Sequence, residues 1–258
     1  MSPTVRRGPG ALYGGEAVSA VAKGTVTAEQ LYEDAVGRVE EWEPDLGAIV
    51  EQIPYRTPAE GPLRGMCLGI KVYQDVSGFR NWRSLQTQGV EGPPASVDST
   101  VVSRLKQAGA TLVGTTAAPF LGAPGGVTPQ TRNSRSPDRV SGGSSGGSAS
   151  AVAAGMIHGA LGSDSGGSIR IPAACCGVVG LQTTRGLVPL AGARGLTYSM
   201  GNVGPIASTV EDARLILDVI AGFDPEDPYS VPTPPRETWD ETPLSFGVPA
   251  ELVDQSMD

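Results

Sequence analysis

Histidine, cysteine, aromatic and basic residues are all scarce in this chain of 258 residues, which has one histidine and three cysteines. Its 19 basic residues are outnumbered by 27 acidic ones, and the net charge is -8. Phosphate binding relies on clustered Lys and Arg, so this balance argues against a nucleic-acid partner. No apolar run is long enough for a transmembrane helix, and no signal segment is recognisable at the N-terminus. These absences favour a globular protein of the cytoplasm.

The few cysteines and the single histidine limit the chemistry further. Cys67, Cys175 and Cys176 are odd in number and two are adjacent, so neither a disulfide framework nor a zinc site is indicated. We expect all three to be small buried hydrophobic residues. His158 lies within an apolar segment, and a Ser-His-Asp triad would have to use it. We favour a structural role for this histidine.

Glycine and proline are abundant, with 36 and 22 copies, and they predict short elements joined by many turns. Helices and strands alternate along the chain, which predicts one α/β domain over residues 1–258 with a mixed sheet covered by helices on both faces. The helices are expected at 15–23, 27–42, 99–108, 149–161 and 209–220. The strands are expected at 66–73, 111–115, 177–182 and 245–248, with loops at 54–65, 84–98, 119–139 and 187–205.

The segment 141–170 contains two Gly-Gly-Ser turns, at 142–144 and 166–168. Glycine lets main-chain N–H groups approach a ligand, so each turn is a candidate serine on a loop rich in hydrogen-bond donors. A phosphate-binding loop or a flexible linker is the alternative. A phosphate-binding loop would need a Gly-Lys-Ser/Thr ending, which is missing here. A flexible linker would leave Ile169, Ile171 and the apolar residues between the turns exposed.

Lys71 interrupts the apolar run 66–73. A charge there is costly, so this lysine must be paired, point out of the sheet or be held neutral. A neutral lysine can act as a base in place of histidine. Near the second turn, Asp164 and Arg170 are close enough to form a supporting charge pair. Ser145 and Ser148 are expected to cap or hydrogen-bond the following helix.

The runs 142–148, 162–172 and 176–181 resemble the amidase signature family. The likeness is continuous from about residue 63 to 220 and weaker in the N-terminal helices. It includes Lys71, Ser144 and Ser168 in family order. The resemblance implies that Ser168 attacks an amide carbonyl and that Ser144 relays its proton to Lys71. It also implies a cis peptide bond between Gly143 and Ser144.

The same resemblance implies an oxyanion hole made of main-chain N–H groups, an acyl-enzyme hydrolysed by water, and no metal or organic cofactor. The N–H donors would be those of Ser165, Gly166, Gly167 and Ser168. The function expected is cleavage of a small carboxamide by this Ser-Ser-Lys triad. Acyl transfer to an amine by the same triad is an alternative, and so is a non-catalytic or partner-completed subunit.

Two features depart from the family pattern. Val72 follows Lys71 where members commonly have an aspartate. Members also usually continue well beyond the position of Asp258. The expected parts are a helical region at 1–62, a catalytic core at 63–222, and the start of a shortened C-terminal part at 223–258. A second polypeptide, a homodimer across the sheet edge at 245–248, or a reduced family member would each account for the difference.

Overall fold

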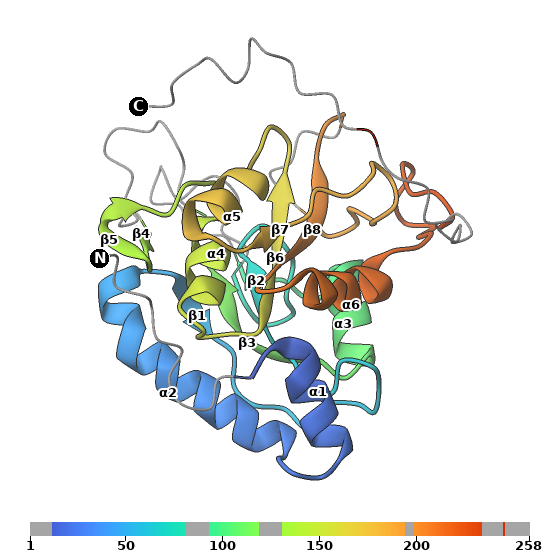
Figure 1. Ribbon diagram of the computed structural model, residues 1–258. Coiled ribbons are helices and arrows are strands. Elements are labelled where there is room, and N and C mark those ends of the chain that lie inside the picture. Colours follow the sequence, from blue (N-terminus) through green and yellow to red (C-terminus); the bar gives the residue numbers. More distant parts are fainter. Residues whose placement is uncertain (1–11, 81–92, 119–130, 194–198, 234–244, 246–258) are drawn as a thin grey trace.

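A mixed six-stranded sheet forms the centre of the computed structural model, which describes residues 12–80, 93–118, 131–193, 199–233 and 245 (Figure 1). The strand order is β1-β3-β2-β6-β8-β7. Strand β2 pairs in parallel with both β3 and β6, whereas β1–β3, β6–β8 and β7–β8 are antiparallel. The strands are β1 (Ile49–Gln52), β2 (Cys67–Lys71), β3 (Thr111–Thr116), β6 (Gly159–Asp164), β7 (Val179–Gly180) and β8 (Asn202–Ala207).

Two hydrophobic cores lie on opposite faces of this sheet, and Figure 1 shows their helices on either side of the strands. The first core includes residues of α1 (Gly14–Ala22), α2 (Ala28–Leu46), α4 (Gly146–Ala153) and α5 (Arg170–Cys176). The second includes residues of α3 (Thr100–Gln107) and α6 (Val210–Ile220). The predicted α/β class, with a mixed sheet covered on both faces, is therefore confirmed.

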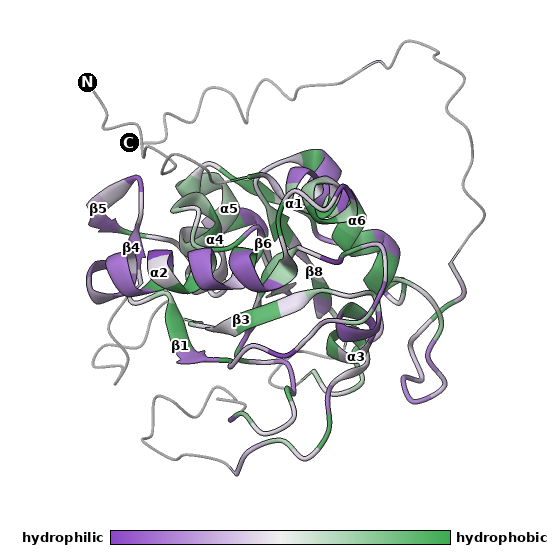
Figure 2. Ribbon diagram, turned by 90° about the horizontal axis from the view of Figure 1, so that it is seen from below, coloured by the Kyte–Doolittle hydropathy of each residue, from purple (hydrophilic) through white to green (hydrophobic). Residues whose placement is uncertain are grey.

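Helix α2 begins and ends as its sequence indicates. The Thr27 Oγ1 atom accepts from the Gln30 N–H at 3.1 Å, and Gln30 Oε1 accepts from the Thr27 N–H at 2.9 Å. This reciprocal capping box satisfies two N–H groups that have no partner within the helix. The helix runs past the predicted end at residue 42 to Leu46, where Gly47 ends it with φ 59°. Figure 2 shows its largely hydrophilic outer face.

The helix predicted at 149–161 is wrong in its second half. Helix α4 ends at Ala153, and the chain then turns at Gly155, whose φ is +73°. The following residues form β6, which lies between β2 and β8 and is buried throughout. Small apolar residues suit a strand covered on both faces as well as a buried helix, so their composition could not separate the two.

Strand β8 lies where a loop was expected, within 187–205, and continues to Ala207. Gly204 and Pro205 conceal it in the sequence, because both residue types are depleted in strands. The glycine is needed there, since a Cβ at Gly204 would lie 2.2 Å from the Leu181 carbonyl oxygen. The predicted strand at 177–182 shrinks to the two residues of β7.

Four further elements were not predicted. They are β1, α5, and the two strands of a hairpin, β4 (Arg132–Asn133) and β5 (Ser136–Val140). The hairpin occupies part of the expected loop at 119–139, of which 119–130 lies outside the described residues. The strand predicted at 245–248 also lies outside them, except for Ser245.

Candidate active site

Lys71 is the last residue of β2, and its side chain is fully buried. Its Nζ atom lies 2.8 Å from Ser144 Oγ, 2.9 Å from Ser145 Oγ and 2.8 Å from Ser163 Oγ. The centre of the Tyr73 ring lies 4.7 Å from the same nitrogen. The sequence left open whether this lysine is paired, points out of the sheet or is held neutral. The structure shows that it is buried and hydrogen-bonded to hydroxyl groups.

Burial lowers the pKa of Lys71 from 10.5 to about 7, because the ammonium form loses its hydration, while the negative charge of Asp164 opposes the shift. A neutral amine offers two N–H donors and one lone pair, so one hydroxyl neighbour donates to the nitrogen. Ser145 Oγ already donates to the Ser163 carbonyl oxygen at 3.2 Å. The lone pair is therefore left for Ser144 or Ser163.

Ser144 follows a cis peptide bond from Gly143, as the family resemblance implied. Its side chain is half-buried, and Lys71 is the hydrogen-bond partner of its hydroxyl. The next residue connects this turn to the second one, because the Ser145 N–H donates to the Ser168 carbonyl oxygen at 3.0 Å. Two turns that are 24 residues apart in the sequence therefore lie side by side.

Ser168 lies on the turn between β6 and α5, and Asp164 holds that turn. The carboxylate accepts from the N–H groups of Gly167 at 2.6 Å and Ile169 at 3.1 Å, and from the Arg170 guanidinium at 3.1 Å. Burial favours the neutral acid, but the hydrogen bonds from Arg170 and the backbone outweigh it and lower the pKa of Asp164 to about 2. The expected charge pair is present.

The four candidate oxyanion donors are not equivalent. The Gly167 N–H is already bound to Asp164, so three N–H groups, those of Ser165, Gly166 and Ser168, remain as candidates. Gly166 is exposed, and a Cβ placed on it would have no atom of the described residues within 4 Å. Open space therefore adjoins the turn that carries Ser168, whose side chain is half-buried.

Ser145 and Ser163 are the lysine partners that the sequence did not indicate. Ser145 was expected to cap α4, but its side chain makes no capping hydrogen bond and contacts Lys71 and Ser163 instead. Ser148 does not cap α4 either, since its hydroxyl bonds Thr116 at 2.6 Å and the Leu161 carbonyl at 3.0 Å. A signal was available: hydroxyl residues flank both turns, next to Ser144 and next to Asp164.

Other residues singled out by the sequence take structural positions. His158 is buried, and its Nδ1 accepts from the Cys67 N–H at 2.9 Å, on the β2 strand. Val72 packs in a small core with Tyr73 and Ala118. Cys67 and Cys176 are buried, but Cys175 is exposed, which corrects the expectation for that thiol. Cys175 lies near the end of α5, a short helix with one side in solvent.

Two features are absent from the described residues. No group of three His, Cys, Asp or Glu side chains there is arranged to hold a metal ion. None of the helices in the same part of the chain has the length and apolar character needed to cross a membrane.

Residues 27–258 match the family model described as Amidase, and the chain belongs to this family. It is 44% identical over 208 residues to the A subunit of glutamyl-tRNA(Gln) amidotransferase from Natronomonas pharaonis, covering 76% of this chain and 48% of that protein. The solved structure of the same subunit from Thermotoga maritima is similar, with a TM-score of 0.77 and 32% identity. The match covers 86% of this chain and 49% of that one. The structure of 6-aminohexanoate cyclic dimer hydrolase with its substrate is also similar, with a TM-score of 0.78 and 30% identity. The match covers 88% of this chain and 50% of that protein.

The chain thus spans about half the length of these relatives. They include both a component of an amidotransferase and a hydrolase. The chain contains a lysine and serine hydrogen-bond network, and membership of the family does not select one reaction for it.

Proposed function

We propose that this chain carries the catalytic residues of an amidohydrolase that cleaves a small carboxamide through an acyl-enzyme on Ser168. The observation that carries the proposal is the buried Lys71 amine, bound to the Ser144 hydroxyl at 2.8 Å and with a pKa of about 7. An amine with that pKa is about half neutral at neutral pH and can accept a proton. A charged surface lysine could not do so.

In the first step, the Ser168 oxygen forms a bond to the amide carbon, the π electrons of the C=O bond move onto its oxygen to give an oxyanion, and the Ser168 proton passes to Ser144 Oγ. The Ser144 proton moves to the Lys71 nitrogen, which becomes an ammonium near the negative charge of Asp164. The same proton then returns to the amide nitrogen as the C–N bond breaks and the amine or ammonia leaves. Water attacks the acyl-enzyme by the same relay and releases the carboxylic acid.

Within the described residues, no hydrogen bond joins the Ser144 and Ser168 hydroxyls; the two turns meet through the backbone instead. Catalytic hydrogen bonds are often long before substrate is bound and shorten in the complex. The proposed oxyanion donors are the N–H groups of Ser165, Gly166 and Ser168, and one such donor typically contributes about 3 kcal/mol to transition-state stabilisation.

Replacing Ser168 with alanine tests this proposal. The Ser168→Ala variant is expected to lose turnover of small carboxamides and covalent labelling by a fluorophosphonate probe, because both require the attacking oxygen. Ser103→Ala, which removes a hydroxyl on the outer side of α3, serves as the matched control and keeps both activities. Labelling that survives in Ser168→Ala would reject the assignment.

Acyl transfer is the second candidate, and it is favoured by the relatives named as part of an amidotransferase. In this reaction an amine replaces water, or the released ammonia reaches another acceptor. Supplying candidate amines and measuring how the acyl group partitions between acid and new amide separates the two. Acid as the only product at saturating amine would exclude transfer.

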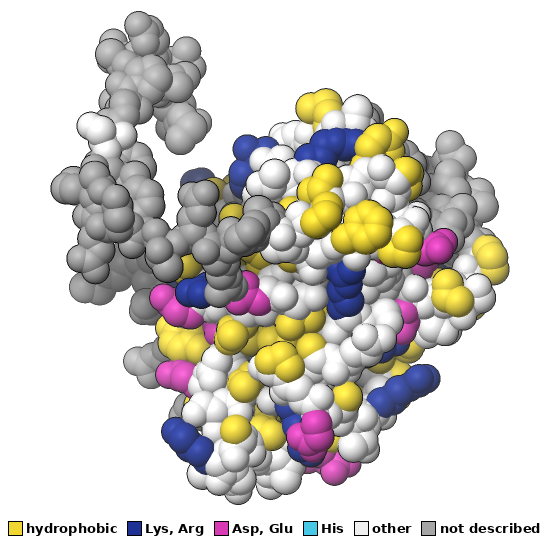
Figure 3. Space-filling model, turned by 90° about the vertical axis from the view of Figure 1, so that its right-hand side faces the viewer, with side chains coloured by type: hydrophobic (Ala, Val, Ile, Leu, Met, Phe, Trp, Pro, Cys, Tyr) yellow, Lys and Arg dark blue, Asp and Glu magenta, His cyan; other side chains and the backbone are white. Residues whose placement is uncertain are grey.

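We further propose that this chain assembles with another polypeptide, either a different chain or a second copy of itself. The support is a set of exposed hydrophobic residues beyond α6: Phe223 is 55% exposed, Tyr229 48% and Val231 44%. Figure 3 shows hydrophobic side chains grouped among mixed charges on the right-hand face of the molecule. Light scattering of the purified chain measures its mass; a fully active monomer would contradict this proposal.

A further inference from the structure

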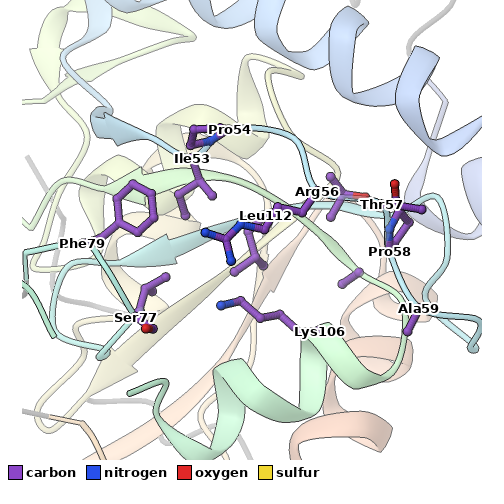
Figure 4. A pocket seen from close by; sticks show the side chains of 13 residues that line it. Ile53, Pro54, Arg56, Thr57, Pro58, Ala59, Ser77, Phe79, Lys106 and Leu112 are labelled. Atoms are coloured by element: carbon purple, nitrogen blue, oxygen red, sulfur yellow. The ribbon is translucent and has the colours of Figure 1, made fainter. Parts of the chain in front are cut away.

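A cavity of about 190 Å³ lies at the far end of β3 from the proposed catalytic lysine. It is lined by the start of β3, by the segments after β1 and after β2, and by α3 (Figure 4). In the parallel register, Lys71 is paired with Thr116, while the cavity adjoins Thr111 and Leu112. At about 3.3 Å per residue, this places its floor about 15 Å along the sheet from the lysine.

The walls of this cavity are mainly apolar, with Ile53, Val76, Phe79 and Leu112 among the thirteen lining residues. Apolar cavities of about 150 Å³ are large enough to bind benzene. The space here therefore admits one ring, or a branched aliphatic group of similar size. Binding such a group would be favourable because its apolar surface would be removed from water.

Two cations line the same space, and Figure 4 shows the Arg56 and Lys106 side chains extending in the same direction, with their charged ends near one another in this view. Lys106 is already paired with Asp98, at 2.8 Å and 2.7 Å to its two oxygens. Arg56 has no hydrogen-bond or ion-pair partner within the described residues. Among the described residues that line the cavity, none is acidic. The site thus offers one uncompensated positive charge beside an apolar chamber.

We propose that this cavity is a binding site for a small monocarboxylate with a compact apolar body, such as an aromatic carboxylate. A carboxylate carries a single charge and accepts two parallel hydrogen bonds from a guanidinium. Its apolar body fills the chamber between Phe79 and Leu112. A phosphate fits less well, because its second charge and its further oxygens would face apolar walls. The site is separate from the proposed catalytic residues and does not depend on their function.

Benzoate is the probe for this proposal, with benzyl alcohol as its neutral analogue and inorganic phosphate as an anion without an apolar body. Titration calorimetry on the full chain is expected to detect benzoate binding, and to show affinities at least tenfold weaker for the other two. The Arg56→Met variant is expected to bind benzoate at least tenfold more weakly. Arg139→Met, which removes the same charge from the exposed hairpin strand β5, is the matched control and binds normally.

A second variant separates the cavity from a general charge effect. Ala59→Trp places a large ring at an exposed lining position, and it is expected to abolish benzoate binding without changing the net charge. Circular dichroism confirms that the variant is folded. Benzoate binding that is unchanged in both Arg56→Met and Ala59→Trp would overturn the proposal, as would phosphate binding as tightly as benzoate.

Discussion

The environment of a single amine, that of Lys71, explains most of the chemistry proposed for this chain. Three serine hydroxyls surround its nitrogen within 2.9 Å, and the side chain is fully buried. The sequence identified Lys71 because a lysine inside an apolar run must have an unusual environment. It did not identify Ser145 and Ser163, because a serine next to glycine looks the same whether it caps a helix or faces a buried amine.

Ser163 is expected to position Lys71 for proton transfer. Ser163→Ala removes one of the three hydroxyl contacts, and we expect kcat to fall about tenfold, equivalent to about 1.4 kcal/mol. The midpoint of the pH profile is expected to shift as well, because the amine loses a hydrogen-bond partner. Ser163→Thr retains the hydroxyl and should restore both values. A loss of stability with unchanged kcat and unchanged pH midpoint would show a purely structural role.

Burial of Lys71 also predicts how stability varies with pH. Its pKa is about 7 in the folded chain, whereas the ordinary value of 10.5 applies when the side chain is in water, as in the unfolded chain. Between these values the unfolded chain binds the extra proton, so the free energy of unfolding rises with pH. Below about pH 7 both states are protonated, and the full cost of burying the ammonium remains.

The Lys71→Met variant has no such group, so its advantage in the free energy of unfolding over the natural chain is expected to be largest at pH 6. The difference should shrink steadily towards pH 10. Urea unfolding of both proteins at pH 6, 8 and 10 measures it. A difference that is the same at all three pH values would show that Lys71 titrates normally in the folded chain.

At the scale of elements, α4 is placed by close contact with the end of β3. A Cβ at Gly147 would lie 2.4 Å from the Ala117 nitrogen and 2.5 Å from the Ala48 carbonyl oxygen. The Gly147 N–H also donates to the Ala117 carbonyl at 3.0 Å. Because α4 directly follows Ser144 and Ser145, this contact holds the first serine turn against the sheet.

Alanine substitution at two helical glycines tests that contact. Glycine in a helix interior ordinarily costs about 1 kcal/mol relative to alanine. Gly37→Ala in α2 is therefore expected to stabilise the chain by about 0.5–1 kcal/mol, since no atom of the described residues outside the local helix lies within 4 Å of the added Cβ. Gly147→Ala is expected to destabilise it by roughly 2 kcal/mol or more, the usual cost of overpacking. Thermal unfolding of both variants decides this, and stabilisation at Gly147 would contradict the proposed close approach.

At the scale of the whole molecule, sequence patterns predicted the α/β class, the two helical layers and the elements that have clear caps. Thr27 and Thr209 each cap a helix as expected. The sequence patterns gave the wrong secondary structure where the residue composition of a segment is unusual for the element that it forms. Strand β8 contains Gly204 and Pro205 yet lies in the sheet, and β6 has the composition of a buried helix. Only the neighbouring strands determine what these segments become, and a single sequence does not show strand pairing.

The candidate site, like the fold, could be predicted from the sequence only in part. The order of Lys71, Ser144 and Ser168 indicated which residues to examine, and the structure brings the first two into hydrogen-bond contact. The use of the Gly167 N–H by Asp164 was not predictable, because several neighbouring carboxylates and donors could have paired otherwise.

The rate of Ser168 labelling by a fluorophosphonate, measured against pH, tests the proposed proton relay most directly. In the natural chain the rate should rise with pH around a midpoint near 7, as the Lys71 ammonium loses its proton. In Lys71→Met the labelling rate should be at least a hundredfold lower, which corresponds to an increase of about 2.7 kcal/mol in the activation free energy. The midpoint near pH 7 should be absent. A Lys71→Met protein that labels Ser168 at the natural rate with the same midpoint would contradict the account.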